Sequence, residues 1–277
     1  MSSLKLSIAV NSYKSPELLR LCLRSIHDNV SGIDFEIISV DSATEETTEM
    51  MMREEFPSVR FFPYRENVGF KTLVNRSMEE SRGEYIFLIN SDIIINKDTV
   101  ALMLDFMDRH KNIALVGPRQ INFNGQDQIS CCRFYRPMTI LYRRSILGKL
   151  PWGKKHLDWF LMKDYDRKEP RAVDWIMGSA MLVRREVAVE VGAMDNRFFM
   201  YMEDVDWCRR FWEKGHLVVY FPFATVFHYH AKGSAHGGVL GLLFNRLTWW
   251  HIASAFKYFW KYRGKELPQT DRQIETA

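Results

Sequence analysis

The chain has 277 residues, and 47% of them are apolar, which suits one large domain or a domain with an appendage. Its formal net charge of +4 is too small to indicate a nucleic acid partner. Its four cysteines lack metal-ligand spacing, and the N-terminus lacks the features of a signal peptide, so we expect a cytoplasmic protein.

Strand-like and helix-like segments alternate through the first half of the chain. The expected strands are 4–13, 35–42, 59–64 and 83–92. The expected helices are 16–29, 44–56, 69–81 and 97–110. Alternation of this kind predicts an α/β fold with a Rossmann-like, mostly parallel central sheet flanked by helices.

This alternation stops after residue 121. Residues 122–170 contain ten Lys or Arg against five Asp or Glu, and we interpret them as an irregular insertion or lid. Regular elements return with a helix over 200–215, paired strands within 217–230 and a C-terminal amphipathic helix.

Polar side chains stand at the ends of three expected strands, namely Asn11, Asp41 and Asp92. Because parallel sheets bind ligands beyond the carboxyl ends of their strands, we expect these side chains to converge on one rim. Asp41 could accept a hydrogen bond from a nucleobase or ribose there, or only cap the next helix. Asn90 lies on the same side of the pleat as Asp92, so the two could hold a divalent ion or form only a strand-terminal turn.

Three further segments carry candidate functional groups. Gly69 opens a helix whose backbone N–H groups could face a phosphate, which is weak evidence by itself. Glu203 and Asp206 share one helix face, and a carboxylate of this acidic segment could act as a general base or merely begin the helix. His228 and His230 alternate along a strand and therefore share a face, either as structural groups or as metal ligands.

Taken in this order, the segments resemble the family 2 glycosyltransferases of the GT-A fold, most closely their rhamnosyltransferase-like branch. The resemblance covers residues 4–236 and includes SIAVNSYKS, ISVDSATEETTE and ENVGFKTLVNRSMEESRGEYIFLINSD. Two later segments, DWIMGSAMLVRREVAVEVGAMDNRFFMYMEDVDWCRR and FHYHAKGS, are similar to the acceptor-side block and the closing histidine segment of the family.

The resemblance implies a donor site and an acceptor site. Residues implied in nucleotide-sugar binding are Asn11, Tyr13, Asp41, Asn67, Gly69, Phe70, Lys71, Asn75, Asn90, Ser91 and Asp92. Residues implied on the acceptor side are Trp175, Gly178 and Ser179. Two positions depart from the family pattern: Asn90 stands where many relatives have Asp, and Lys71 stands where a small residue is more usual.

The resemblance also implies the chemistry. Asp204 would be the catalytic base with Glu203 beside it, and Asp92 would bind Mg²⁺ or Mn²⁺ together with His228 or His230. A divalent ion would offset the negative charge that develops on a nucleoside diphosphate leaving group. A carboxylate on the far side of the sugar would deprotonate the acceptor hydroxyl, and this single displacement inverts the anomeric carbon.

The expected function is therefore inverting transfer of a sugar, for example rhamnose, from a dTDP- or UDP-sugar to a glycan or lipid-linked saccharide in cell-surface polysaccharide synthesis. One alternative is a sugar-phosphate nucleotidyltransferase, but no glycine-rich triphosphate loop follows the first strand. Another is a catalytically silent carbohydrate- or partner-binding module, against which the intact Glu203–Asp204 pair argues.

The expected domain organisation is a glycosyltransferase domain, 1–236, followed by a helical extension, 237–277. The domain would divide into a nucleotide-sugar-binding half, 1–121, the insertion, 122–170, and an acceptor and catalytic half, 171–236.

The extension includes an apolar segment, 240–260, that also contains Arg246 and Lys257. A central Arg or Lys costs about 2.5–3.5 kcal/mol in a membrane, so a spanning helix is disfavoured. One interpretation is a helix packed on the domain with a basic outer stripe. The other is an interfacial helix over 240–263 on an anionic membrane, which would place the protein peripherally on the inner face of the cell membrane. The aromatic residues expected at headgroup level are Trp249, Trp250 and Trp260.

Overall fold

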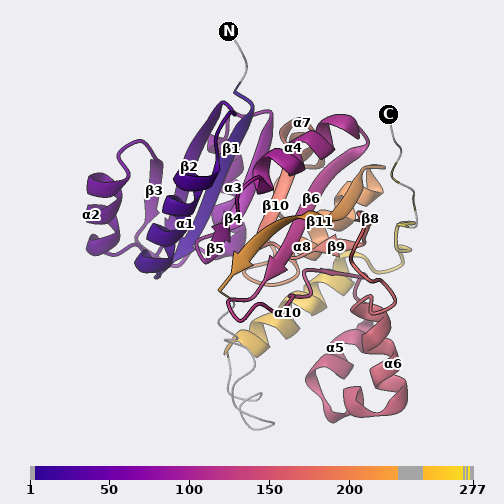
Figure 1. Cartoon of the computed structure of the whole chain (residues 1–277). Coiled ribbons are helices and arrows are strands. Elements are labelled where there is room, and N and C mark those ends of the chain that lie inside the picture. Colours follow the sequence, from indigo (N-terminus) through magenta and orange to yellow (C-terminus); the bar gives the residue numbers. More distant parts are fainter. Residues whose placement is uncertain (1–3, 230–245, 271, 273, 275–277) are drawn as a thin grey trace.

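The computed structural model describes residues 4–229, 246–270, 272 and 274, and it consists of a central sheet with helices on both faces (Figure 1). The strands of the main sheet are β1 (Leu6–Tyr13), β2 (Phe35–Ser42), β3 (Arg60–Tyr64), β4 (Tyr85–Asn90), β5 (Ile93–Ile95), β6 (Ile113–Ile121), β8 (Arg171–Ala172), β10 (Ala180–Arg184) and β11 (Leu217–His228). The helices are α1 (Pro16–Asn29), α2 (Glu46–Glu55), α3 (Phe70–Glu80), α4 (Thr99–Arg109), α5 (Pro137–Arg144), η1 (Ile146–Lys149), α6 (Pro151–Phe160), α7 (Arg185–Val191), α8 (Glu203–Glu213) and α10 (Arg246–Lys261). The expected α/β fold is confirmed.

The main sheet has the strand order β3-β2-β1-β4-β10-β6-β11-β5 within the described residues, and β8 pairs with β11. β1 runs parallel to β2 and β4, whereas β10 runs antiparallel to both of its neighbours. The expected mostly parallel sheet is therefore confirmed, and the carboxyl ends of β1, β2 and β4 meet at one edge. The expectation of paired strands within 217–230 is wrong, because β11 is one long strand whose register shifts between Phe221 and Thr225.

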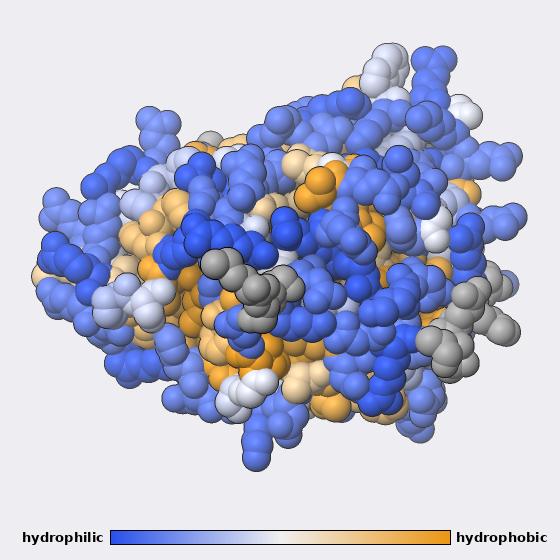
Figure 2. All heavy atoms as spheres, turned by 90° about the horizontal axis from the view of Figure 1, so that it is seen from above, coloured by the Kyte–Doolittle hydropathy of each residue, from blue (hydrophilic) through white to orange (hydrophobic). Residues whose placement is uncertain are grey.

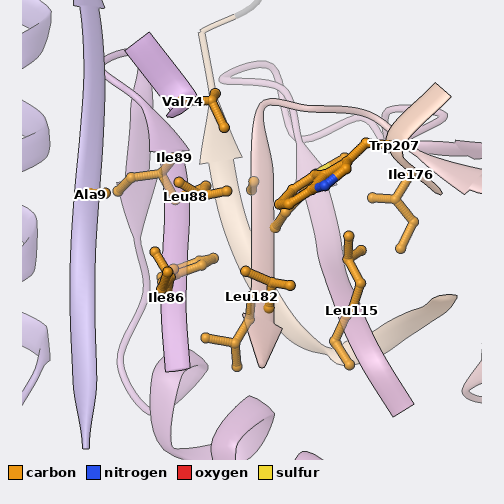
Figure 3. Close-up of a cluster of buried hydrophobic side chains, with 14 of the residues drawn as sticks. Ala9, Val74, Ile86, Leu88, Ile89, Leu115, Ile176, Leu182 and Trp207 are labelled. Carbon is orange, nitrogen blue, oxygen red and sulfur yellow. The ribbon is translucent and has the colours of Figure 1, made fainter. Parts of the chain in front are cut away.

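Buried apolar side chains of the central strands hold these strand ends in place. Figure 3 shows buried side chains from several of these elements, among them Ala9 of β1, Leu88 of β4, Leu182 of β10, Leu115 of β6 and Trp207 of α8. All five are at most 1% exposed. Burial of a leucine contributes roughly 1.5–3 kcal/mol, so such a core fixes the polar residues that follow β1 and β4.

Residues 122–170 are more regular than expected. They contain α5, η1 and α6, and the short strand β7 (Cys131–Cys132) pairs with β9 (Trp175–Ile176). Both α-helices have a proline in the first turn, where no intrahelical N–H bond is lost. The expectation of an irregular segment is wrong. It gave weight to the basic composition and not to the two prolines that mark the beginnings of α5 and α6. Figure 1 shows α5 and α6 beside the end of the molecule that carries α10.

The C-terminal helix α10 packs on the domain with a face different from the one expected. Lys261 Nζ contacts Asp206 Oδ1 at 2.5 Å and Asp195 Oδ2 at 2.8 Å, and Lys257 Nζ donates to the carbonyl oxygen of Arg197 at 2.9 Å. The expected basic outer stripe is therefore wrong, because these lysines bond back to the domain. Within the described part of the chain, no helix is long and apolar enough to cross a bilayer.

Candidate active site

A cavity of about 220 Å³ opens at the edge where β1 and β4 end. Predicted donor-site residues that line it are Asn11, Tyr13, Asn67, Gly69, Phe70, Asn90, Ser91 and Asp92. Lining residues that sequence reasoning missed include Ser12, Ser15, Ser42 and Met200. Ser15 bonds across the cavity wall to Ser91, with 3.1 Å between the hydroxyl oxygens, and forms no side-chain cap for α1. The structure thus gathers most of the predicted donor residues around one space.

Asn11 and Asp41 lie at the ends of adjacent strands but have different surroundings. Ser77 of α3 donates to Asn11 Oδ1 at 2.9 Å, which fixes the asparagine at the cavity wall. Asp41 pairs in register with Ser12, is 2% exposed, and does not line the cavity itself. Burial raises the pKa of Asp41, and its Oδ1 atom has no hydrogen-bond partner among the described residues. A buried acceptor of this kind suits a ligand that brings a donor.

The entrance to α3 depends on a glycine. Gly69 has φ +78°, and a Cβ atom there would lie 2.7 Å from the carbonyl oxygen of Phe199. Asn67 supports this turn, because its Oδ1 accepts a bond from the Gly69 N–H at 3.1 Å. The glycine therefore allows Phe199 to pack closely against the start of α3, beside the cavity that Gly69 lines.

Lys71 and Asn75, both predicted for the donor site, lie away from the cavity. Lys71 Nζ donates to Asn196 Oδ1 at 2.7 Å. The Asn75 amide makes two bonds with the Met194 backbone, at 3.0 and 2.8 Å. Both side chains therefore hold the loop that precedes α8, and their donor-binding roles remain predictions.

The end of β4 presents acceptor atoms that no described residue satisfies. The Oδ1 atoms of Asn90 and Asp92 are buried and lack hydrogen-bond partners within the described chain. Asp92 Oδ2 lies 3.4 Å from His228 Nε2 at the end of β11. Carboxylate, amide and imidazole groups suit Mg²⁺ or Mn²⁺, so these residues fit the implied ion. Among the described residues, no group of three or more His, Cys, Asp or Glu side chains could hold a metal ion, and His230 lies outside them.

Glu203 and Asp204 begin α8 and have distinct environments. Asp204 accepts backbone bonds from Gly178 at 3.1 Å and from Val205 at 2.9 Å. Glu203 is 5% exposed, and its Oε2 atom has no partner among the described residues. Burial and the nearby Asp204 carboxylate raise the pKa of Glu203 to about 8. Burial also raises the pKa of Asp204, against the effect of its two N–H donors.

Of the predicted acceptor-side residues, Gly178 contacts the acidic pair directly. A Cβ atom on Gly178 would lie 3.0 Å from the Phe70 ring and 3.5 Å from Asp204 Cβ, so this glycine lies between the cavity wall and the carboxylate. Trp175 is buried, and its Nε1 donates to the carbonyl oxygen of Arg133 at 2.8 Å. Ser179 Oγ donates to Gln120 Oε1 at 2.9 Å.

Comparison with known proteins gives consistent matches. The glycosyl transferase family 2 model matches residues 7–192. The N-acetylglucosaminyl-diphospho-decaprenol L-rhamnosyltransferase of Mycobacterium tuberculosis is 30% identical over 72% of this chain and 67% of the relative. The rhamnosyltransferase WbbL of Escherichia coli K12 is 26% identical over 73% of this chain and 71% of the relative.

Two solved structures share the fold. One is GalNAc-T7 with UDP, GalNAc and Mn²⁺, at a TM-score of 0.60 and 13% identity over 83% of this chain. The other is the mannosyltransferase PcManGT from Pyrobaculum calidifontis with GDP-Man and Mn²⁺, at 0.58 and 16% over 84% of this chain. The present chain spans 44% and 59% of the lengths of these two solved chains. The expected GT-A fold is confirmed.

Proposed function

Since the chain belongs to glycosyl transferase family 2, it is a glycosyltransferase, and we propose that it transfers a sugar from a nucleoside diphosphate sugar to an acceptor hydroxyl with inversion. The observation that carries this proposal is the position of Asp204. Its carboxylate accepts bonds from two backbone N–H groups, one of them that of Gly178. Gly178 lies between Asp204 and Phe70, and Phe70 lines the cavity at the ends of β1 and β4.

The reaction is a single displacement. The acceptor oxygen bonds to the anomeric carbon, the bond from that carbon to the diphosphate oxygen breaks, and the hydroxyl proton passes to Asp204. The nucleoside diphosphate leaves with the electron pair of the broken bond. Asp92 and His228, with Asn90 adjacent, would hold a divalent ion, which would supply positive charge for the leaving diphosphate when bound.

Glu203 has a different role from its neighbour. Burial and the neighbouring Asp204 carboxylate raise the pKa of Glu203 to about 8, which favours its protonated form. A neutral Glu203 leaves a single negative charge on the pair, and the backbone donors favour placing that charge on Asp204. Asp204 is therefore the base in this proposal, and Glu203 is its neutral partner.

The donor is a dTDP- or UDP-sugar, with dTDP-rhamnose the first choice. Two rhamnosyltransferases of M. tuberculosis and E. coli match more than two thirds of the chain and support this choice. Asp41 is assigned to the nucleoside, since its buried Oδ1 atom requires a donor. The acceptor is a glycan or a lipid-linked saccharide, as the decaprenol-linked substrate in the name of the M. tuberculosis relative suggests.

Asp204→Asn tests the base. General base catalysis contributes about 10²–10⁴ in rate, so we expect transfer to fall about 1,000-fold while donor binding stays within a few-fold. The assay follows release of nucleoside diphosphate from a panel of dTDP-, UDP- and GDP-sugars with lipid-linked acceptors, with and without EDTA. Asp28→Asn, an exposed acidic residue on α1, is the control. Unchanged turnover in Asp204→Asn would exclude the proposed base.

We also propose that α10 lies on an anionic membrane surface. Trp249, Ile252, Phe256 and Trp260 are 39–68% exposed and fall within about 80° of the helix circumference at 100° per residue. Trp250 instead packs on Phe199, with 5.1 Å between the ring centroids. An exposed ridge of Trp, Phe and Ile fits the boundary between headgroups and acyl chains.

The neighbouring helices add charge to this surface. Between Asp127 and Asp158 the sequence has seven Lys or Arg and no Asp or Glu. α5 packs beside α10 through a bond between Arg144 Nη2 and His251 Nδ1 at 2.6 Å. Neither Arg143 nor Arg144 forms an ion pair with a carboxylate of the described chain. These cations suit anionic headgroups and the phosphates of a lipid-linked acceptor.

Liposome flotation tests the membrane proposal. The triple substitution Trp249→Ser, Phe256→Ser and Trp260→Ser should weaken binding to vesicles containing phosphatidylglycerol at least 10-fold. Val189→Ser is the control, because Val189 is 69% exposed on α7, at the opposite end of the molecule (Figure 1). Equal flotation of the triple variant and the wild type would exclude α10 as the membrane contact.

A further inference from the structure

Gln128 makes a bidentate contact with the histidine at the proposed ion site. Its Oε1 lies 2.8 Å from His228 Nδ1, and its Nε2 donates to the His228 carbonyl oxygen at 3.0 Å. The same Nε2 donates to Asn122 Oδ1 at 2.6 Å. The two N–H bonds of this amide and its oxygen are therefore all engaged.

These contacts determine the orientation of the amide. The His228 carbonyl oxygen can only accept, so the Gln128 atom facing it must be the nitrogen. The other amide atom, facing the ring, is then the oxygen, which can only accept. In the neutral imidazole the proton must therefore lie on Nδ1, and the lone pair lies on Nε2.

The lone pair on Nε2 points to the region of Asp92 Oδ2, which lies 3.4 Å away. By itself, Asp92 would favour a proton on Nε2, because a carboxylate accepts hydrogen bonds. With the proton on Nδ1, the lone pair of Nε2 faces Asp92, and this is the form in which an imidazole nitrogen can bind a metal ion. Gln128 therefore decides between a histidine that bonds Asp92 and a histidine that binds a metal ion.

Backbone hydrogen bonds support the segment that contains Gln128. Its backbone N–H donates to the Gln120 carbonyl oxygen at 2.9 Å, and the chain between them closes a tight turn in which Asn122 N bonds Gln126 O at 2.8 Å. Gln120 belongs to β6, which pairs in parallel with β11, the strand that ends at His228. The turn after β6 therefore places Gln128 beside His228, because β6 and β11 are paired strands.

We propose that Gln128 is a positioning residue that sets the Nδ1–H tautomer and the ring orientation of His228 for a divalent cation. The inference rests on the proposed ion site, and it assigns a function to a residue that the sequence did not single out. Groups that orient metal-binding histidines commonly contribute 10–100-fold to metal affinity.

The first test needs no substitution. A long-range ¹H–¹⁵N spectrum of the metal-free protein at alkaline pH reports which ring nitrogen of a histidine carries the proton, and the His228→Ala spectrum identifies the signals of His228. We expect the Nδ1–H form. An Nε2–H form in the wild type would overturn the inference.

The second test measures Mn²⁺ affinity by electron paramagnetic resonance, with the metal alone. Gln128→Met keeps the side-chain length without the amide, and we expect a 10–100-fold weaker affinity and a shift toward the Nε2–H tautomer. Gln126→Met is the matched control, because Gln126 is an exposed residue of the same turn, and it should bind Mn²⁺ as the wild type does.

The outcomes distinguish the proposed ion site, which includes His228, from the proposed positioning role of Gln128. Weaker binding in both His228→Ala and Gln128→Met supports both proposals. Weaker binding in His228→Ala with wild-type affinity in a folded Gln128→Met overturns the positioning role alone. Wild-type affinity in His228→Ala removes the histidine from the ion site and overturns both. Absence of sugar transfer with every donor would refute the proposed reaction and leave these metal measurements standing.

Discussion

Glu203 and Asp206 lie within one turn of α8, but their carboxylates have different surroundings. Asp206 is fully buried and is bonded by Lys261 Nζ at 2.5 Å, Tyr262 Oη at 2.9 Å and Arg210 Nε at 3.0 Å. Glu203 is also buried, at 5% exposure, but has an Oε2 atom without a partner in the described chain. Asp206 therefore joins α8 to α10, whereas Glu203 keeps an oxygen that no described residue bonds.

The same contrast extends to the two edges of the sheet. The edge with the cavity presents the unpartnered oxygens of Asn90 and Asp92. The opposite edge, seen in Figure 2, is covered mostly by hydrophilic side chains, and Lys5 there contacts Glu84 at 3.0 Å and Asp108 at 2.9 Å. Natural proteins satisfy nearly all buried polar atoms, so unpartnered oxygens of two residues that line a cavity indicate a ligand site.

The largest effect on stability should follow from Asp206→Asn. Removing one partner of a buried ion pair leaves the other charge uncompensated, so we expect a loss of about 3 kcal/mol in the free energy of unfolding. Urea denaturation measures it. The double variant Asp206→Asn, Lys261→Met should lose less than the sum of the two single variants. Strict additivity would show that the two groups are not coupled and would weaken the contrast with Glu203.

Much of the framework behind this contrast could be predicted from the sequence. Alternating strands and helices up to residue 121, with Asn11 and Asp92 at strand ends, suffice to predict the sheet and its functional edge. The partners of Asp206 and His228 could not be predicted, since Lys261 is 55 residues from Asp206 and Gln128 is 100 residues from His228. Sequence periodicity reports the buried face of one element, not which distant side chain meets it.

An intermediate effect should appear as a pH dependence of stability at Glu203. Its pKa is raised from 4.5 to about 8 in the folded chain, mainly by burial, so the folded state keeps a proton that the unfolded state releases. This contribution to stability is complete below about pH 4.5 and is lost as the pH rises through about 8. Glu203→Gln stays neutral, so its stability relative to the wild type should increase between pH 5 and pH 9. Urea midpoints at pH 5, 7 and 9 measure it, and parallel profiles for the two proteins would contradict the raised pKa.

The smallest effect on stability should come from Lys5→Met. Lys5 can be compared directly with Lys261, because the two lysines have the same bonding pattern. Each lysine contacts two carboxylates, but the Lys5 side chain is 31% exposed and its partners about 40%, whereas Asp206 beside Lys261 is fully buried. Exposed ion pairs contribute roughly 0–1 kcal/mol, because water solvates the separated charges well. Lys5→Met should therefore cost less than about 1 kcal/mol, and 1 M NaCl should reduce that cost further.

A loss equal to that of Lys261→Met would mean that burial is not what distinguishes the two sites. The number of ionic contacts, and not their burial, would then explain the anchoring of α10.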